Sequence, residues 1–162
     1  MKDVTILDTT LRDGSYVNRF QFSTAETSYL AERLDDAGLE FVEVGHGLGL
    51  GAYRKGGEYA AAATDEEYLN AAIPSVKRAK IGMFCIPGFA ELEDLDMAVS
   101  LGMKFVRVGT NVTEVEQSRP FIEKAKKHGI FVCANYMKSY ALAPKELAKK
   151  VEISKSYGVD MI

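Results

Sequence analysis

Arg12, Asp13 and Gly14 are the adjacent residues with the clearest chemical potential in this 162-residue sequence. An aspartate oxygen is a ligand that divalent cations such as Mg²⁺ and Mn²⁺ prefer. A guanidinium can hold a carboxylate or a developing enolate oxygen through two parallel hydrogen bonds. Gly14 permits a sharp turn that would aim both side chains inward. A surface turn with a weak ion pair uses the same residues, so the triplet alone leaves both interpretations open.

The elements that would position this triplet are indicated by a short repeat. Each copy has a glycine followed by apolar, often β-branched residues, at 38–44, 102–108, 128–133 and 157–162. Glycine suits the end of a helix, and the apolar run suits a buried parallel strand. We therefore expect strands over residues 4–8, 41–45, 80–85, 105–109, 130–135 and from 159 onward.

The segments before these glycines predict helices. Ser23 and Thr64 each begin a capping box, because glutamate follows three positions later. Pro74 should start a second helical turn or kink the helix that begins at Thr64, and Pro144 suits the start of a helix. We expect the other helices over residues 91–101, 116–127 and 145–157.

Strict alternation of strands and helices predicts a parallel sheet with right-handed crossovers. Two architectures have this alternation, a doubly wound open sheet and a (β/α)8 barrel. A complete barrel typically needs about 250 residues, and six strands in this length approach six-eighths of one. We interpret residues 1–162 as the amino-terminal part of a single TIM-barrel domain, with five βα units and the start of a sixth strand. The alternative is a complete flavodoxin-like domain.

Composition narrows the class of protein. Lys and Arg number 20 against 23 Asp and Glu, for a net charge of −3, which argues against a nucleic-acid partner. The longest nearly apolar stretch, 81–90, is about half a membrane span, so we expect no membrane segment. Cys85 and Cys133 are too few for a disulfide scaffold. These features favour a soluble cytoplasmic protein.

The carboxyl ends of the strands are where parallel α/β folds build their sites. Polar residues follow four of the predicted strands there. They are Asp8, Thr9, Thr10, Arg12, Asp13, Glu43, His46, Arg107, Thr110, Asn111, Asn135, Tyr136, Ser139 and Tyr140.

A wider stretch around the triplet resembles a known signature. Residues 7–14, Leu-Asp-Thr-Thr-Leu-Arg-Asp-Gly, are similar to the signature of the metal-dependent lyases and synthases built on a (β/α)8 barrel. That superfamily includes hydroxymethylglutaryl-CoA lyase, isopropylmalate synthase and 4-hydroxy-2-oxovalerate aldolase. Ser15 matches the aldolase branch, and residues 42–47, 107–110 and 139–147 are similar to aldolase segments. The chain thus resembles the aldolase branch over essentially its whole length.

The resemblance implies a reaction and a metal. Members of the aldolase branch use Mn²⁺ or Mg²⁺ to cleave or form a C–C bond of a 4-hydroxy-2-keto acid, giving pyruvate and an aldehyde. Asp13 would be a metal ligand, and Arg12 would stabilise the pyruvate enolate. The remaining ligands of the family are a His-x-His pair expected beyond Ile162. The 162-residue chain by itself should therefore have little or no aldolase activity.

Other residues receive roles by the same resemblance. Ser139 matches a position that contacts the substrate, and Glu43 would orient Arg12 or a metal-bound water or serve as an inward structural carboxylate. His46 would face the substrate or pack within its loop. Tyr16 stands where the family has its histidine base, and since an ordinary tyrosine pKa lies near 10, Tyr16 is a poor base. It could act as an acid or orient the substrate hydroxyl, and Tyr140 replaces a second family histidine.

Two further interpretations remain at this point. The chain could be a non-catalytic partial barrel, or an open-sheet module that binds a phosphate-bearing ligand through the glycine-rich residues 45–57. An incomplete barrel leaves its first and sixth strands unpaired, which predicts a homo-oligomer. Full-length aldolases of this branch often associate with an aldehyde dehydrogenase that consumes the aldehyde.

Overall fold

The computed structural model describes residues 4–162 and contains five parallel strands that neighbour one another in chain order. Each strand leads into a helix that returns the chain to the start of the next strand. The strands are β1 (Leu7–Asp8), β2 (Phe41–Glu43), β3 (Lys80–Cys85), β4 (Phe105–Asn111) and β5 (Phe131–Met137). The helices are α1 (Thr24–Asp36), α2 (Asp65–Ala72), α3 (Leu92–Ser100), α4 (Arg119–Lys127) and α5 (Pro144–Ser156).

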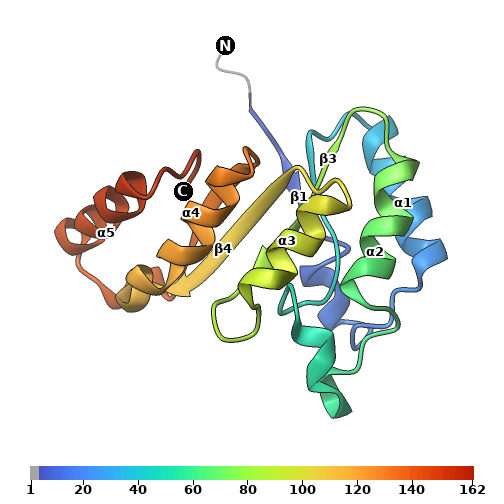
Figure 1. The fold of residues 1–162 in the computed structure, drawn as a ribbon, viewed down its shortest axis with the longest axis horizontal. Coiled ribbons are helices and arrows are strands. Elements are labelled where there is room, and N and C mark those ends of the chain that lie inside the picture. The colour runs from blue at the N-terminus through green and yellow to red at the C-terminus, as the bar shows by residue number, and fades with distance from the viewer. Residues whose placement is uncertain (1–3) are drawn as a thin grey trace.

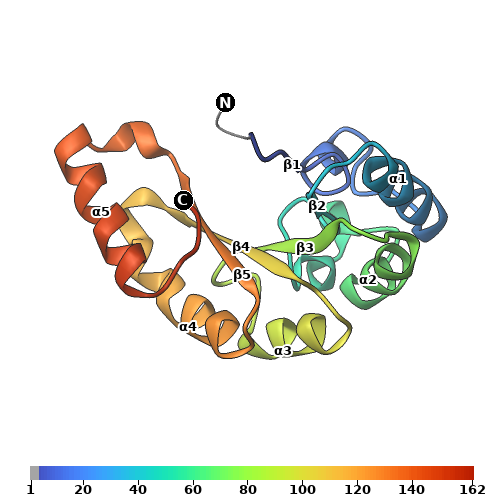
Figure 2. The same ribbon diagram turned by 90° about the horizontal axis from the view of Figure 1, so that it is seen from above.

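The sheet curls, and the helices lie along its outer side (Figures 1 and 2). In Figure 2, β1 and the C-terminal residues flank the side that the helices leave open. A doubly wound sheet would reverse its strand order and carry helices on both faces. The observed order β1-β2-β3-β4-β5 confirms the incomplete barrel. The flavodoxin-like alternative is wrong, and so is the open sheet that the binding-module interpretation assumes.

Several element boundaries differ from the sequence-based expectation. The first strand pairs with β2 only at Leu7 and Asp8. Val4 and Ile6 precede the first pair and are exposed. The sixth strand is represented by one bridge, between Cys133 and Met161. The helix expected over residues 116–127 is α4, which begins only at Arg119 and has a proline in its first turn. Proline suits that place because it lacks the N–H that a helix start leaves unpaired. The residues before α4, Val112–Ser118, form a 3-10 segment.

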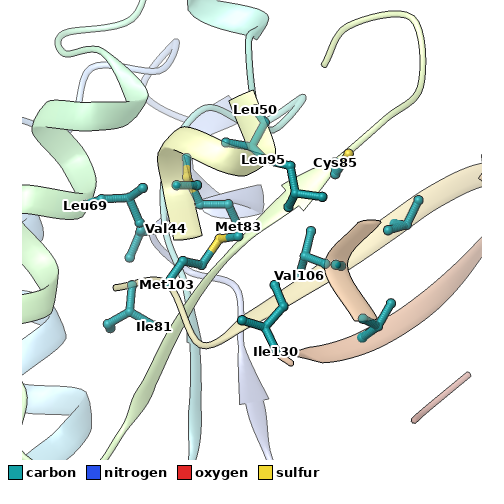
Figure 3. Packing of buried hydrophobic residues seen from close by; sticks show 14 of the residues in the cluster. Val44, Leu50, Leu69, Ile81, Met83, Cys85, Leu95, Met103, Val106 and Ile130 are labelled. Atoms are coloured by element: carbon teal, nitrogen blue, oxygen red, sulfur yellow. The ribbon is translucent and has the colours of Figure 1, made fainter. Parts of the chain in front are cut away.

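Alternation along the strands divides their side chains between two faces. The outward residues pack under the helices in a cluster that includes Val44, Ile81, Met83, Val106 and Ile130 (Figure 3). The other residues of each strand, which alternate with them, face the inside of the curled sheet. This division follows from the period of two in a strand and leaves the inner face to carry polar groups.

Gly82 shapes the inner face. It lies between Glu43 on β2 and Phe105 on β4 in the strand register. Without a side chain at Gly82, residues of β2 and β4 meet across β3, and the rings of Phe41 and Phe105 lie 5.2 Å apart. A Cβ at Gly82 would overlap the Phe105 ring and carbonyl oxygen. Glu43 of β2 and Arg107 of β4 also meet across β3.

Among residues 4–162, no helix is long and apolar enough to cross a membrane. Cys85 and Cys133 are both buried free thiols. Burial raises the pKa of both thiols, that of Cys133 to about 11, so neither is a ready nucleophile at neutral pH.

Candidate active site

The turn after β1 directs Arg12 and Asp13 differently. The carbonyl oxygen of Thr9 accepts hydrogen bonds from the backbone N–H groups of Arg12, Asp13 and Gly14, at 3.0, 2.7 and 3.2 Å. Leu11 is buried and anchors the turn. The Arg12 side chain is 8% exposed, whereas the Asp13 side chain is 61% exposed. Arg12 therefore belongs to the interior of the curl, and Asp13 is open to a ligand.

Glu43 is the centre of a buried charged cluster. Its side chain is 0% exposed, and its Oε2 accepts from Arg12 Nε and from Arg107 Nη2, each at 2.6 Å. Its Oε1 accepts from Arg107 Nε at 2.9 Å. A carboxylate without access to water requires such partners, because burying an unpaired charge is very costly. Glu43 thus holds two guanidinium groups side by side.

An aromatic ring and an amide complete the cluster. The guanidinium carbons of Arg12 and Arg107 lie 4.5 and 4.8 Å from the centre of the Phe84 ring, within the range of cation–π attraction. Arg107 Nη1 donates to Asn135 Oδ1 at 3.0 Å, and Arg12 Nη1 donates to Asp13 Oδ1 at 2.7 Å. Each guanidinium is therefore fixed on several sides before any ligand arrives.

The charge of Arg107 is maintained within this cluster. Burial alone would lower the pKa of its guanidinium, but the hydrogen bonds and negative charge of Glu43 outweigh burial, and the pKa of Arg107 is raised. Arg12 and Arg107 carry two positive charges against the two carboxylates of Glu43 and Asp13. The four side chains are thus neutral together, so a divalent cation would leave a net charge of +2 to face an anion.

A cavity of about 320 Å³ opens beside this cluster at the carboxyl ends of the strands. Its polar lining comes from the loops and strands just described, and its apolar lining from neighbouring positions. The lining residues are Arg12, Asp13, Tyr16, Gly47, Leu48, Phe84, Ile86, Arg107, Asn135 and Met137. Preformed cationic donors against apolar walls are suited to a small organic anion.

Tyr16 lines the same cavity and is about half exposed. Burial raises the pKa of its phenol, and the nearby Asp13 carboxylate acts in the same direction, while Arg12 opposes them. The phenol therefore keeps its proton at neutral pH. Its ring packs edge-on against Phe20, with 5.0 Å between ring centres. Tyr16 can donate a hydrogen bond to a ligand in the cavity.

His46 lies behind the cavity wall. Its side chain is buried, and its ring stacks on Phe20 at 3.9 Å between centres. Its Nδ1 accepts from the backbone N–H of Leu48 at 3.0 Å, and its Nε2 lies 3.0 Å from the carbonyl oxygen of Tyr59. Burial lowers the pKa of the imidazole, which fits a neutral ring that donates from Nε2. Both nitrogens are engaged within the protein.

Ser139 lies in the 3-10 turn Ser139–Ala141 that follows β5. It is exposed and does not line the cavity. Within residues 4–162, no three or more His, Cys, Asp or Glu side chains form a group that could hold a metal ion. The structure thus brings Arg12, Asp13, Tyr16 and Glu43 together, and it places His46 and Ser139 outside the cavity lining.

Arg107 and Asn135 were not assigned a role from the sequence. Both were recognised only as polar residues near strand ends. Their strand register places them beside Phe84 and Gly109, respectively, on the inner face. An alternation count along β4 and β5 from Phe105 and Phe131 would have indicated this, because residues two apart share a face.

A larger groove of about 550 Å³ lies at the opposite, amino ends of β3 to β5. Lys77, Arg78, Lys80 and Lys104 line it together with apolar residues. Its lining includes no carboxylate, histidine or thiol. It therefore lacks the side chains that commonly bind metal ions, and the smaller cavity, where Asp13 lies beside two arginines, is the candidate active site.

The glycine-rich loop that supplies Gly47 and Leu48 is anchored by a second buried carboxylate. Asp65 Oδ2 accepts from the Gly51 N–H at 2.6 Å, while its Oδ1 has no hydrogen-bond partner among residues 4–162. Arg54, in the same loop, is committed to Asp94 through bonds of 2.6 and 2.7 Å. Burial raises the pKa of Asp65 to about 7, Asp94 adds to the rise, and the bond from Gly51 and the charge of Arg54 oppose it.

Replacement Asp65→Asn should remove a pH dependence of stability. Since the folded pKa lies above the ordinary 3.8, the folded state holds a proton that the unfolded chain loses between about pH 4 and pH 7. Stability due to Asp65 is therefore full below this window and falls as pH rises through it, by up to about 1.4 kcal/mol per pH unit. Urea unfolding should show Asp65→Asn to be more stable than wild type at pH 8 but not at pH 4. The exposed neighbour Glu66→Gln is the control, and equal pH slopes for Asp65→Asn and wild type would refute the prediction.

The curled parallel sheet defines the chain as part of a (β/α)8 barrel, and its candidate site lies at the carboxyl ends of the strands. The sequence matches the HMGL-like family over residues 3–162, and the chain belongs to that family.

Curated relatives agree with this assignment. The 4-hydroxy-2-oxovalerate aldolase 2 of Rhodococcus jostii strain RHA1 is 41% identical over 162 residues, covering 99% of this chain and 47% of the relative. The 4-hydroxy-2-oxovalerate aldolase of Pelotomaculum thermopropionicum is 38% identical over 161 residues, with the same coverage of each chain. The chain spans about half the length of these relatives.

Solved structures are similar in fold. The carboxyl transferase domain of Rhizobium etli pyruvate carboxylase, solved with pyruvate, has a TM-score of 0.70 and 15% identity, covering 98% of this chain and 30% of that one. The N-terminal domain of a Bacteroides vulgatus protein has a TM-score of 0.63 and 18% identity, covering 98% of this chain and 62% of that one.

Proposed function

We propose that this protein is the amino-terminal part of a divalent-metal-dependent aldolase. The reaction cleaves or forms a C–C bond of a 4-hydroxy-2-keto acid, giving pyruvate and an aldehyde. The observation that carries the proposal is the buried Arg12–Glu43–Arg107 cluster beside the open carboxylate of Asp13. Relatives about 40% identical are named 4-hydroxy-2-oxovalerate aldolases, which supports the same chemistry.

The charge that develops in the reaction matches the cluster. In the cleavage direction, the C4 hydroxyl gives its proton to water and becomes the aldehyde carbonyl, while the electron pair of the C3–C4 bond becomes a pyruvate enolate, with negative charge on an oxygen. The enolate then takes up a proton at C3 to give pyruvate. A fixed guanidinium opposes that charge without having to reorganise, which is the usual source of a large rate effect. Arg12 fits this role because Glu43, Asp13 and the Gly47 carbonyl oxygen already hold its donors.

The described residues can supply part of a metal site. Asp13 Oδ1 accepts from Arg12 Nη1, and no partner within residues 4–162 is recorded for Asp13 Oδ2, so this oxygen is available to a hard cation. When bound, Mn²⁺ or Mg²⁺ would polarise the keto group. One carboxylate supplies one ligand, so the proposal requires ligands from outside this chain.

The other predicted residues take roles that their positions allow. Tyr16 keeps its proton and orients the substrate hydroxyl, while Glu43 is a positioning residue for both arginines. His46 acts indirectly by holding the backbone of Leu48, which lines the cavity. Ser139 remains a proposed substrate contact, since its turn follows β5 directly.

The isolated chain should turn over slowly and bind manganese weakly through Asp13. With Mn²⁺ and 4-hydroxy-2-oxovalerate, coupled detection of pyruvate should give a rate far below the 1–10³ s⁻¹ typical of enzymes, at about the uncatalysed rate. Electron paramagnetic resonance of free Mn²⁺ should show millimolar binding that Asp13→Asn removes.

The control for Asp13→Asn is Asp36→Asn, which removes an exposed carboxylate at the end of α1. It should leave manganese binding unchanged. Turnover at an ordinary enzymatic rate would contradict the expected weakness of the fragment. Manganese binding that survives Asp13→Asn would contradict the metal role of Asp13.

A second candidate is a non-catalytic partial barrel. It is favoured by the single available carboxylate and by Tyr16 at the position of the family's base. Binding of a keto acid and Mn²⁺ without turnover, even when a complementary barrel half is supplied, would support this candidate over the aldolase.

We also propose self-association, in the cytoplasm, through the open edges of the sheet. Val4 and Ile6 near β1, and Met161 and Ile162 beside β5, are exposed apolar residues. Unpaired strand edges with such residues tend to pair with another chain. Light scattering at micromolar concentration should give a mass above 17.8 kDa, and a clean monomer would contradict the proposal.

A further inference from the structure

Asn135 is a polar residue of the cavity that the proposed mechanism does not use. It lies on β5, opposite Gly109 of β4 in the strand register. It lines the cavity together with Arg12 and Arg107. Its Oδ1 accepts a hydrogen bond from Arg107 Nη1 at 3.0 Å.

The orientation of this amide follows from the chemistry of its partner. A guanidinium has five N–H donors and no acceptor, so only the amide oxygen of Asn135 can face Arg107. Arg107 is itself held by Glu43 through Nε and Nη2. Because Glu43 fixes Arg107, and Arg107 binds the amide oxygen of Asn135, the Nδ2 end of the Asn135 amide remains for other partners.

The remaining end is a donor. Within residues 4–162, no acceptor is recorded for Asn135 Nδ2, and none for Arg12 Nη2. Two residues that line the cavity, Asn135 and Arg12, thus each have an N–H group without an acceptor among residues 4–162. Such groups favour a ligand whose oxygens carry no protons, because a ligand that presents a donor would leave them unpaired.

We infer that Asn135 is a specificity-determining residue whose Nδ2 donates to an acceptor oxygen of an anionic ligand in the cavity. Taking that ligand to be a 2-keto acid rests on the proposed function. The donor role itself requires only a small planar anion with adjacent acceptor oxygens. Arg107 and Glu43 position the amide, and Arg12 supplies the second contact.

Oxalate is a suitable probe because it is a planar dianion with only acceptor oxygens. In ¹⁵N–¹H spectra, the side-chain amide of Asn135 is identified by the signals that disappear in Asn135→Asp. Titration of wild type with oxalate should shift these amide protons downfield and saturate. Binding should weaken at least tenfold in Asn135→Leu, which removes the donor without changing charge, and further in Asn135→Asp.

The order of the two variants separates donation from mere positioning. Aspartate keeps an acceptor for Arg107, whereas leucine does not, so a positioning role alone would make Asn135→Asp the better binder. The exposed Asn70→Asp on α2 makes the same charge change away from the cavity and should alter binding less than twofold.

Three results would overturn the inference: no oxalate binding at millimolar concentration, binding without a shift of the Asn135 amide, or Asn135→Asp binding oxalate better than Asn135→Leu does. The aldolase proposal can be refuted independently of this inference. If no pyruvate is formed under any condition while the amide shift and the variant order are observed, the inference stands and the proposed reaction does not.

Discussion

Glu43→Gln should lower the free energy of unfolding by about 3–5 kcal/mol, the range for breaking a buried ion pair by removing one partner. The side chain of Glu43 is completely buried, and its two oxygens accept three N–H bonds from Arg12 and Arg107. A glutamine has one acceptor oxygen and turns an N–H₂ donor towards guanidinium donors. The two guanidinium groups would then share only the Asp13 carboxylate, which is 61% exposed and bonds to Arg12, and the charge of Arg107 would be unpaired. Urea unfolding followed by circular dichroism measures the change.

The matched control is Glu40→Gln, three residues earlier. Glu40 pairs with Lys80 at 2.8 Å, but both side chains are about half exposed. Exposed pairs contribute about 0–1 kcal/mol, so this variant should unfold almost as wild type does. A Glu43→Gln variant as stable as Glu40→Gln would show that the cluster does not depend on its central carboxylate.

Gly49→Ala should be the most disruptive single-methyl change in the glycine-rich loop. Gly49 has a φ of +88°, and a Cβ there would lie 2.6 Å from the Phe84 carbonyl carbon and still closer to its oxygen. The same carbonyl oxygen accepts from the Leu50 N–H at 2.8 Å, so the loop cannot shift without losing that bond. We expect a cost of about 1–2 kcal/mol from the left-handed backbone and about 1–3 kcal/mol from the clash with backbone atoms.

Gly38→Ala isolates the backbone contribution. Gly38 has nearly the same φ as Gly49, +87°, but a Cβ there would meet nothing within 4 Å. It should therefore carry only the conformational cost. Thermal unfolding of both variants measures the difference, and equal losses would show that β3 yields to the added methyl group.

Much of the fold was predictable because its signals are local. The capping boxes at Ser23 and Thr64 both form as expected, and Pro144 occupies the first turn of α5. Strand ends were less predictable, since a strand ends where its pairing with the neighbouring strand ends, and the local sequence does not indicate that point. The first strand is short for this reason, although Val4 and Ile6 have the residue types of a strand.

The candidate site was predictable in part. Arg12 and Asp13 are indicated by a contiguous pattern, whereas Arg107 lies 64 positions beyond Glu43 and contacts it only through the tertiary arrangement of β2 and β4. His46 was expected either to face the substrate or to pack within its loop. Its ring nitrogens are both used by the loop backbone, and no local pattern could have indicated that choice.

The sequence by itself determined the alternation of strands and helices and the residue types at the strand ends, because helix caps, glycine turns and apolar runs act over a few neighbouring positions. Only the tertiary structure decided that the sheet curls in chain order, that one buried carboxylate holds two guanidinium groups, and that the amide oxygen of Asn135 faces Arg107. These outcomes depend on register and on contacts between residues distant in sequence, where the loss of water makes each charge require a specific partner.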